Sequence, residues 1–142
     1  MIRVVLAVVL ATAIFGIVVP SVEAVDRDRS AALALSELEA VSETAERLAA
    51  ENDPVDPGGS PAAATVTVDP PDPTFVDPGL IRITEESLWW ESPTGRNSTV
   101  EASVPIRVET PIVVTDPARL RLSFVRIDGK PVVRLRADRA RV

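Results

Sequence analysis

The sequence predicts an α+β fold, in which a long N-terminal helix precedes a small antiparallel β-sheet or sandwich. Two observations carry this prediction. Residues 4–51 hold an apolar run and then an apolar stripe at heptad spacing, and both patterns are typical of helices. From residue 64 onward, short stretches rich in Val, Ile and Thr alternate with Pro, Gly and Asp, which indicates strands joined by turns. The expected parts are a transmembrane anchor or signal segment (1–24), an amphipathic helix (25–52), a Pro/Gly linker (53–63) and a β-rich domain (64–142).

The first segment has the composition of a membrane helix. Val4 to Val19 contains no charged residue. Counted over residues 2–22, a helix would be about 31 Å long, close to the roughly 30 Å of a bilayer's hydrocarbon core. Arg3 lies before the run and Glu23 beyond it, which favours an N-terminus inside the cell. We therefore expect one membrane pass through residues 2–22 and an extracytoplasmic C-terminal domain.

A cleaved signal peptide is the alternative for the same segment. Val22 and Ala24 fit the small-residue pattern that precedes a signal peptidase cut, so cleavage would follow Ala24. The apolar run is slightly longer than the roughly 7–15 residues usual in a signal peptide, which favours a retained anchor. Either interpretation requires export.

Residues 25–51 show an amphipathic helical pattern. Its apolar stripe repeats every three to four residues for about three heptads, and its larger members are Leu38, Val41 and Leu48. Two interpretations remain open. The helix packs on its own domain, or it associates with other copies or with partners, in which case these three residues are interface candidates. Asn52-Asp53-Pro54 is expected to end the helix.

The remainder is expected to form five to seven strands. Asp128-Gly129 between two alternating runs is a strong hairpin signal. Pro105 is expected to interrupt the longest extended stretch. The predicted strands are 64–68, 80–84, 87–91, 99–109, 111–115, 120–127 and 131–136, and a Pro/Asp-rich segment, 69–79, separates the first two.

Two features of the β region are candidates for surface roles. Trp89 and Trp90 are adjacent in a predicted strand, so their side chains should point to opposite faces. One is expected in the core and the other exposed or under a loop, and Trp90 is an interface candidate. Asn97-Ser98-Thr99 is an N-glycosylation sequon, which makes Asn97 a glycosylation candidate.

Charge is distributed unevenly along the chain. The net charge is −6, with 14 Arg and a single Lys. Residues 20–116 carry 19 acidic residues against 6 Arg, whereas residues 117–142 have a net charge of +6. Alternating arginines lie on the predicted hairpin at Arg119, Arg121, Arg134 and Arg136, and Arg139 and Arg141 extend the series. They form either a docking surface for an acidic partner, surface glycan or the acidic helix, or a solvated outer face.

Composition excludes several chemistries. Without Cys or His the chain forms no disulfide, no thiolate or imidazole metal site and no Ser-His-Asp triad. No phosphate-binding loop or dinucleotide fingerprint occurs. We therefore expect no catalytic residue, no cofactor and no metal. Nucleic acid is not an expected partner of an exported protein with this net charge, and the acidic, Lys-poor composition is typical of salt-adapted proteins.

The whole chain resembles a small family of haloarchaeal membrane-anchored proteins. The resemblance is carried by the opening Met-Ile-Arg-Val-Val-Leu-Ala-Val, by Pro20-Ser-Val-Glu and Asp26-Arg-Asp-Arg29, by the run from Leu48 to Val55, and by Leu120 to Pro131. Such proteins travel with type IV pilus-like assembly components, so the resemblance implies a role at the cell surface or in a secretion apparatus, with no catalytic motif.

The layout is also similar to that of type IV pilins, which have an apolar N-terminal helix, a proline near position 20, an amphipathic continuation and a β-rich head. The similarity is one of shape, because only three residues precede the apolar run and no glutamate lies in its first turns. The expected function is that of a non-enzymatic, membrane-anchored surface protein, a pilin-like or accessory component of a pilus-like apparatus. Its partners would be the membrane, pilus-like components, or other copies through the 25–51 helix. The alternative is a secreted β-rich binding domain released after Ala24.

Overall fold

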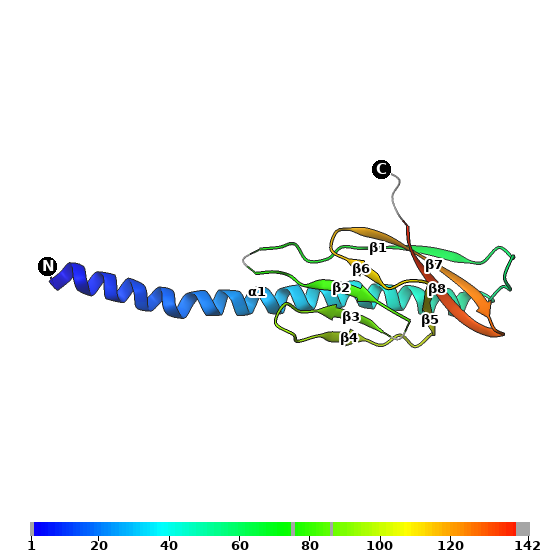
Figure 1. Cartoon of the computed structure of the whole chain (residues 1–142), viewed down its shortest axis with the longest axis horizontal. Coiled ribbons are helices and arrows are strands. Elements are labelled where there is room, and N and C mark those ends of the chain that lie inside the picture. The colour runs from blue at the N-terminus through cyan, green and yellow to red at the C-terminus, as the bar shows by residue number, and fades with distance from the viewer. Residues whose placement is uncertain (1, 75, 86, 139–142) are drawn as a thin grey trace.

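A computed structural model describes residues 2–74, 76–85 and 87–138 of the chain. Within α1 it leaves out the side chains of residues 2, 3, 15, 17, 19 and 20. The described part consists of one long helix, α1 (Ile2–Glu51), and eight strands that form a β-rich head (Figure 1). The predicted α+β class is confirmed.

Helix α1 is continuous over fifty residues. Its backbone stays helical through position 20, so the proline there does not divide the helix into the two segments that the sequence suggested. At its C-terminal end the Asn52 side-chain amide donates a hydrogen bond to the Leu48 carbonyl oxygen (2.9 Å), which satisfies one of the carbonyls that a helix end leaves unpaired. Pro54 follows, and the helix ends where the sequence predicted.

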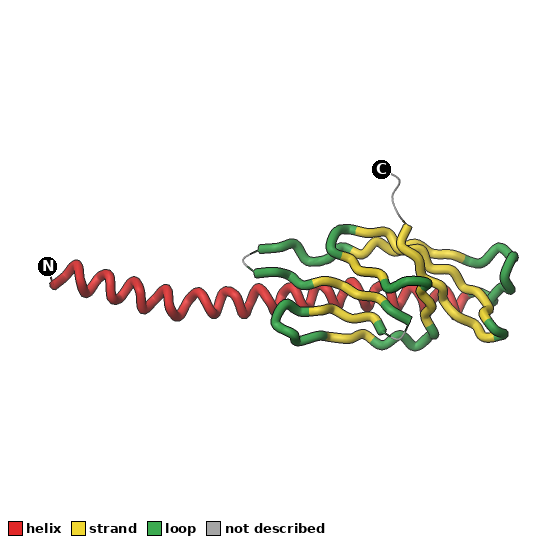
Figure 2. The backbone as a smooth tube through the Cα atoms, viewed as in Figure 1, coloured by secondary structure: helices red, strands yellow, loops and turns green. Residues whose placement is uncertain are grey.

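The strands form two four-stranded sheets (Figure 2). The first sheet has the order β1-β7-β8-β5 and the second β4-β3-β2-β6. All pairs are antiparallel except β5 and β8, which run parallel. The strands are β1 (Ala63–Val68), β2 (Leu80–Ile83), β3 (Leu88–Glu91), β4 (Ser98–Val100), β5 (Ile106–Val108), β6 (Ile112–Val114), β7 (Ala118–Ile127) and β8 (Lys130–Asp138).

Both sheets pack against the second half of α1. The helix contacts β1 and β7 of the first sheet and β3 and β4 of the second. Figure 1 shows this half running along the head, while the first half extends beyond it. The shared core contains helix residues Ala34, Leu38, Val41, Ala45 and Leu48, together with Val68, Ile81, Ile83, Leu88, Trp90, Val108, Val114, Leu120, Leu122, Phe124, Val133 and Leu135.

The predicted strand 99–109 belongs to both sheets. Its first part is in β4 and its last part in β5, and residues 101–105 are not in a strand. The Pro105 carbonyl accepts a hydrogen bond from the Val133 backbone N–H (2.9 Å), and β5 then continues alongside β8. The expected break near Pro105 is therefore the point at which the chain crosses from one sheet to the other, and the head has eight strands in its described part rather than five to seven.

The β7–β8 hairpin turns where it was predicted. Ile127 pairs with Lys130, so Asp128 and Gly129 are the two central residues of the turn. Both have positive φ, 51° and 76°. A type I′ turn requires this at both positions, and Asp-Gly is among the sequences that tolerate it best.

Three carboxylates of α1 hold loops of the head. Asp26 accepts a hydrogen bond from the Thr74 hydroxyl, and Glu37 accepts one from the Asp69 backbone N–H (3.0 Å). Glu46 accepts two from Ser103, from the hydroxyl (2.7 Å) and from the backbone N–H (3.2 Å). The helix therefore contributes polar anchors to the head as well as its apolar stripe.

Candidate functional site

The first half of α1 exposes apolar side chains on all sides. No charged residue lies between Val4 and Val22. The exposed fractions there range from 43 to 67% at Val4, Val5, Leu6, Val8, Val9, Leu10, Ile14, Val18 and Val22. A helix that is apolar all round is normally buried in a large protein or in a membrane, and this half is covered by no other part of the described chain.

Within the described residues, no helix reaches the combined length and hydropathy of a segment that crosses a membrane.

Leu38, Val41 and Leu48 lie in the core of the chain itself. Leu38 and Val41 are completely buried and Leu48 is 7% exposed. They contact the two sheets, so they are not available to another copy or partner in this fold. Of the two interpretations of the heptad stripe, the structure supports packing on the same domain. The large apolar side chains that this part of α1 exposes are Val25 and Leu33.

Trp90 lies in the core and Trp89 on the opposite face of β3. Trp90 is 4% exposed, and its indole N–H donates to the Pro78 carbonyl oxygen (2.9 Å). It is therefore a structural residue rather than an exposed interface anchor. Trp89 is half-buried next to Arg82 of β2. Its Nε1 is buried and has no hydrogen-bond partner among the described residues.

The hairpin arginines lie together on the outward face of the first sheet. We define the arginine face as the side chains of Arg107, Arg119, Arg121, Arg134 and Arg136. Buried Leu120 and Leu122 of β7 and Val133 and Leu135 of β8 alternate with these arginines, so the guanidinium side chains point away from the core. Arg107 of β5 was not singled out from the sequence. It joins the face because β5 pairs with β8.

The strand register places arginines directly opposite one another. Arg121 of β7 is opposite Arg136 of β8, and Arg107 of β5 is opposite Arg134. Like charges directly opposite on a sheet destabilise it. Arg139 and Arg141, which extended the series in the sequence, lie outside the described residues.

Carboxylates relieve part of this repulsion. Glu109, in the β5–β6 loop, pairs with Arg136, and Glu85, in the β2–β3 loop, pairs with Arg107 (3.0 Å). Asp138 is opposite Arg119 in the β7–β8 register. Within residues 2–74, 76–85 and 87–138, Arg119, Arg121 and Arg134 form no ion pair. The Nε of Arg134 is also buried without a hydrogen-bond partner there.

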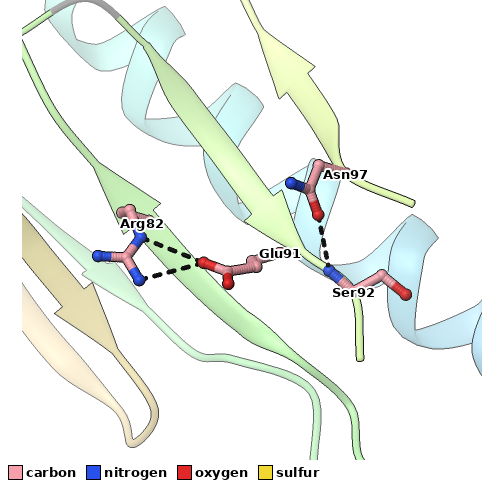
Figure 3. A network of polar contacts seen from close by, with 4 residues as sticks. All are labelled: Arg82, Glu91, Ser92 and Asn97. Atoms are coloured by element: carbon pink, nitrogen blue, oxygen red, sulfur yellow. Dashed lines mark hydrogen bonds and ion pairs between the residues drawn. The ribbon is translucent and has the colours of Figure 1, made fainter. Parts of the chain in front are cut away.

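Asn97 lies at the end of the turn between β3 and β4. Its side-chain oxygen accepts a hydrogen bond from the Ser92 backbone N–H (3.3 Å), as Figure 3 shows next to the Arg82–Glu91 ion pair. Gly95, with φ of 80°, supplies the left-handed conformation that the turn needs. Asn97 is exposed, so a glycan could be accommodated there.

A groove of about 510 Å³ separates this turn from α1. Arg27, Asp28 and Arg96 line it together with Ala24 and Ala31 of the helix, among other residues. Arg27 also pairs with Glu23 (2.9 Å), so the charges around the groove nearly balance. Ala24, the residue before the alternative signal cleavage site, is exposed at the edge of this groove.

Carboxylates are dispersed in the described part of the chain. No group of three or more metal-ligating side chains lies close enough together there to hold a metal ion. The pKa of the Glu46 carboxyl group is clearly displaced. Its pKa is lowered because the Ser103 hydroxyl and backbone N–H, and then the Ser42 hydroxyl, donate hydrogen bonds to the charged form. This arrangement holds a loop against the helix.

The comparisons with known proteins give a family. The model of a domain of unknown function, DUF7311, matches residues 1–138, and the chain belongs to that family. No curated protein and no solved structure matches the chain.

Proposed function

We propose that this member of DUF7311 is a non-enzymatic cell-surface protein that residues 2–22 anchor in the membrane, with the β-rich head outside. The observation that carries the proposal is the exposed, uncharged first half of α1, which continues without a break into the head. From Val4 to Val22 this half is about 28 Å long, close to the thickness of a bilayer's hydrocarbon core. The expected span also includes Arg3 and five apolar positions whose side chains lie outside the described set.

The continuous helix supports a role in which the head is held at a fixed distance from the membrane. A helix without a hinge between the apolar half and the head-bound half transmits position and orientation from one to the other. Helix carboxylates then fix the loops of the head to this rod. This layout supports a pilin-like or accessory role in a pilus-like apparatus, as the family resemblance implies.

Three measurements test the proposal. The native protein should remain in the membrane pellet after alkaline extraction, and its N-terminal sequence should include the apolar run. Coexpression with pilus-like assembly components should allow them to be isolated together with the full chain. A chain that is extracted as a monomer without partners would contradict both parts of the proposal.

A secreted domain released after Ala24 is a second candidate function. The core residues that α1 contributes begin beyond this site, at Ala34, and Ser30 is the first buried residue among the described side chains of the helix. Cleavage after Ala24 would therefore leave intact the core and the four hydrogen bonds that loops donate to helix carboxylates. A mature N-terminus at Val25, measured by mass spectrometry, would establish this alternative and exclude the anchor.

A further inference from the structure

We propose that the arginine face binds an acidic polysaccharide at the cell surface, so that its ligand is a chain of carboxylate- or sulfate-bearing sugars. The inference deepens the proposed function and rests on the extracytoplasmic position of the head.

The arginine face carries more cations than the carboxylates around it neutralise. Five arginines share this face, and nearby described carboxylates number three, Glu85, Glu109 and Asp138. Neighbouring strands are about 4.8 Å apart, and alternate residues along a strand are about 6.8 Å apart. The guanidinium groups therefore start from a grid with spacings of about 5 and 7 Å. Sugars that each carry one acidic group repeat their charges at a similar interval.

Repulsion between the facing arginines is only partly relieved within the described residues. Each guanidinium offers five N–H donors in a planar fork that matches a carboxylate or sulfate. Arg134 forms no ion pair among the described residues, and Arg107 and Ser123 are its neighbours in the sheet. An anionic group held between Arg134 and Arg121 would both accept from the guanidinium groups and relieve the repulsion between the arginines.

The other side chains of this sheet indicate the kind of anion that the face binds. Protein interfaces are built around buried aromatic or apolar anchors. Among the described residues, the exposed large apolar side chains lie on α1 and at Val113 of β6, and none lies on the β1-β7-β8-β5 sheet. Beside Arg121 and Arg119 the neighbouring strand instead presents the exposed Thr65 and Thr67, whose hydroxyl groups suit sugar contacts. A flat, polar and cationic face of this kind favours a polysaccharide over a folded acidic protein.

The position of the arginine face along α1 excludes the lipids of the anchoring membrane as its ligand. Val68 pairs with Ala118 at the start of β7, and the next residue, Asp69, is bonded to Glu37 of α1. Glu37 is fifteen residues beyond Val22, or about 22 Å along the helix. This distance exceeds the Debye length of about 8 Å at physiological ionic strength, so headgroups at the end of the apolar half are too far to neutralise the arginine face.

Binding of the detergent-solubilised full chain to immobilised polygalacturonate tests the inference, in about 0.1 M salt, where the Debye length is about 10 Å. Dextran serves as the neutral polymer and poly-L-glutamate as the acidic polypeptide. The test variant is Arg121→Gln with Arg134→Gln, and the matched control is Arg47→Gln, at an exposed arginine of α1. We expect polygalacturonate to be retained and dextran not. The double variant should bind about tenfold more weakly, because an exposed charge contact is worth up to about fivefold, and the control should bind like the wild type.

A second readout separates a ligand site from a structural role. Removing two arginines that face like charges should raise the Tm of the head in the absence of polymer, while binding falls. Equal binding by the wild type and the double variant would overturn the proposal, and so would poly-L-glutamate binding as tightly as polygalacturonate. Loss of binding together with a lower Tm would also overturn it, because the arginines would then be structural. Alkaline extraction tests the membrane anchor independently of polymer binding. A chain that stays in the membrane but does not bind polygalacturonate therefore refutes this inference and leaves the proposed anchor standing.

Discussion

The two halves of α1 have nearly the same backbone and opposite surroundings. From Ser30 to Leu48 the helix is amphipathic, and its apolar stripe is buried against both sheets. From Val4 to Val22 it carries no charged residue, and the side chains described there are exposed. The second half of α1 has the pattern of a helix with one face in a core and the other in water. The first half has the pattern of a helix that is surrounded by an apolar environment.

The difference shows what decides the role of each half. Both halves are α-helical, so the side chains determine that one half stabilises the head and the other serves as the proposed anchor. Substitutions in the two halves should therefore have separable effects, on unfolding of the head in one case and on membrane retention in the other.

The largest difference in stability between the two halves of α1 is expected when a leucine in each half is replaced by alanine. Leu38→Ala removes a completely buried side chain between the sheets and should lower the free energy of unfolding of the head by about 2–5 kcal/mol. Leu10→Ala, at a position 61% exposed, should leave it unchanged. Thermal unfolding followed by near-UV circular dichroism of the two tryptophans measures both. A similar loss from the two substitutions would show that the halves are not independent.

A charged residue in the apolar half of α1 should reduce retention in the membrane and leave the stability of the head unchanged. Leu10→Arg is expected to cost about 3 kcal/mol for insertion at the centre of a membrane helix, and the fraction left in the pellet after alkaline extraction should fall accordingly. Leu33→Arg is the matched control, because Leu33 is an exposed leucine on the head-bound half. If Leu10→Arg is retained as well as Leu33→Arg, the apolar half does not act as the anchor.

The sequence predicted those features that depend on local patterns. Heptad spacing indicated the helix, and Asp128-Gly129 indicated the hairpin, because a type I′ turn has a strong local sequence preference. The two tryptophans were correctly assigned to opposite faces, since strand side chains alternate. Which of the two is buried depends on the packing of β3 against α1, and sequence alternation alone does not determine it.

Features that depend on distant contacts were not predictable. The same heptad stripe forms whether its partner is a sheet of the same chain or another copy, so Leu38, Val41 and Leu48 were also interface candidates. Residues 101–105 connect the two sheets because β5 pairs with β8, some twenty-seven residues later in the chain. That pairing brings Arg107 to the arginine face, and two loops bring Glu85 and Glu109 next to it. Neither the pairing nor the loop positions can be predicted from a local sequence pattern.

The head also differs from the apolar half in requiring partners for buried polar groups. Trp90→Phe removes the donor to the Pro78 carbonyl and should cost about 1–2 kcal/mol, because the buried acceptor is then unpaired. Trp89→Phe should be neutral or slightly stabilising, because its Nε1 is buried and has no partner among the described residues. Urea unfolding of the two variants distinguishes the cases, and a larger loss at Trp89 would contradict the assignment.

The smallest effect on stability is expected from the hydrogen bonds between Glu46 of α1 and Ser103 of the β4–β5 segment. Hydrogen bonds from Ser103, and secondarily from Ser42, lower the pKa of Glu46 in the folded state below its ordinary value of 4.5. A carboxyl group with a lowered folded-state pKa contributes stability above its unfolded-state pKa, and that contribution is lost as the pH falls through the folded-state value. Glu46→Gln should therefore lower the Tm slightly at neutral pH, and the difference from the wild type should disappear at acidic pH below 4.5.

The control is Glu43→Gln, at an exposed glutamate one turn earlier in α1, which tests whether any helix carboxylate gives the same dependence of Tm on pH. Only the Glu46 variant should converge with the wild type on acidification, because the Ser103 segment is bonded to that carboxylate alone among those of the described helix.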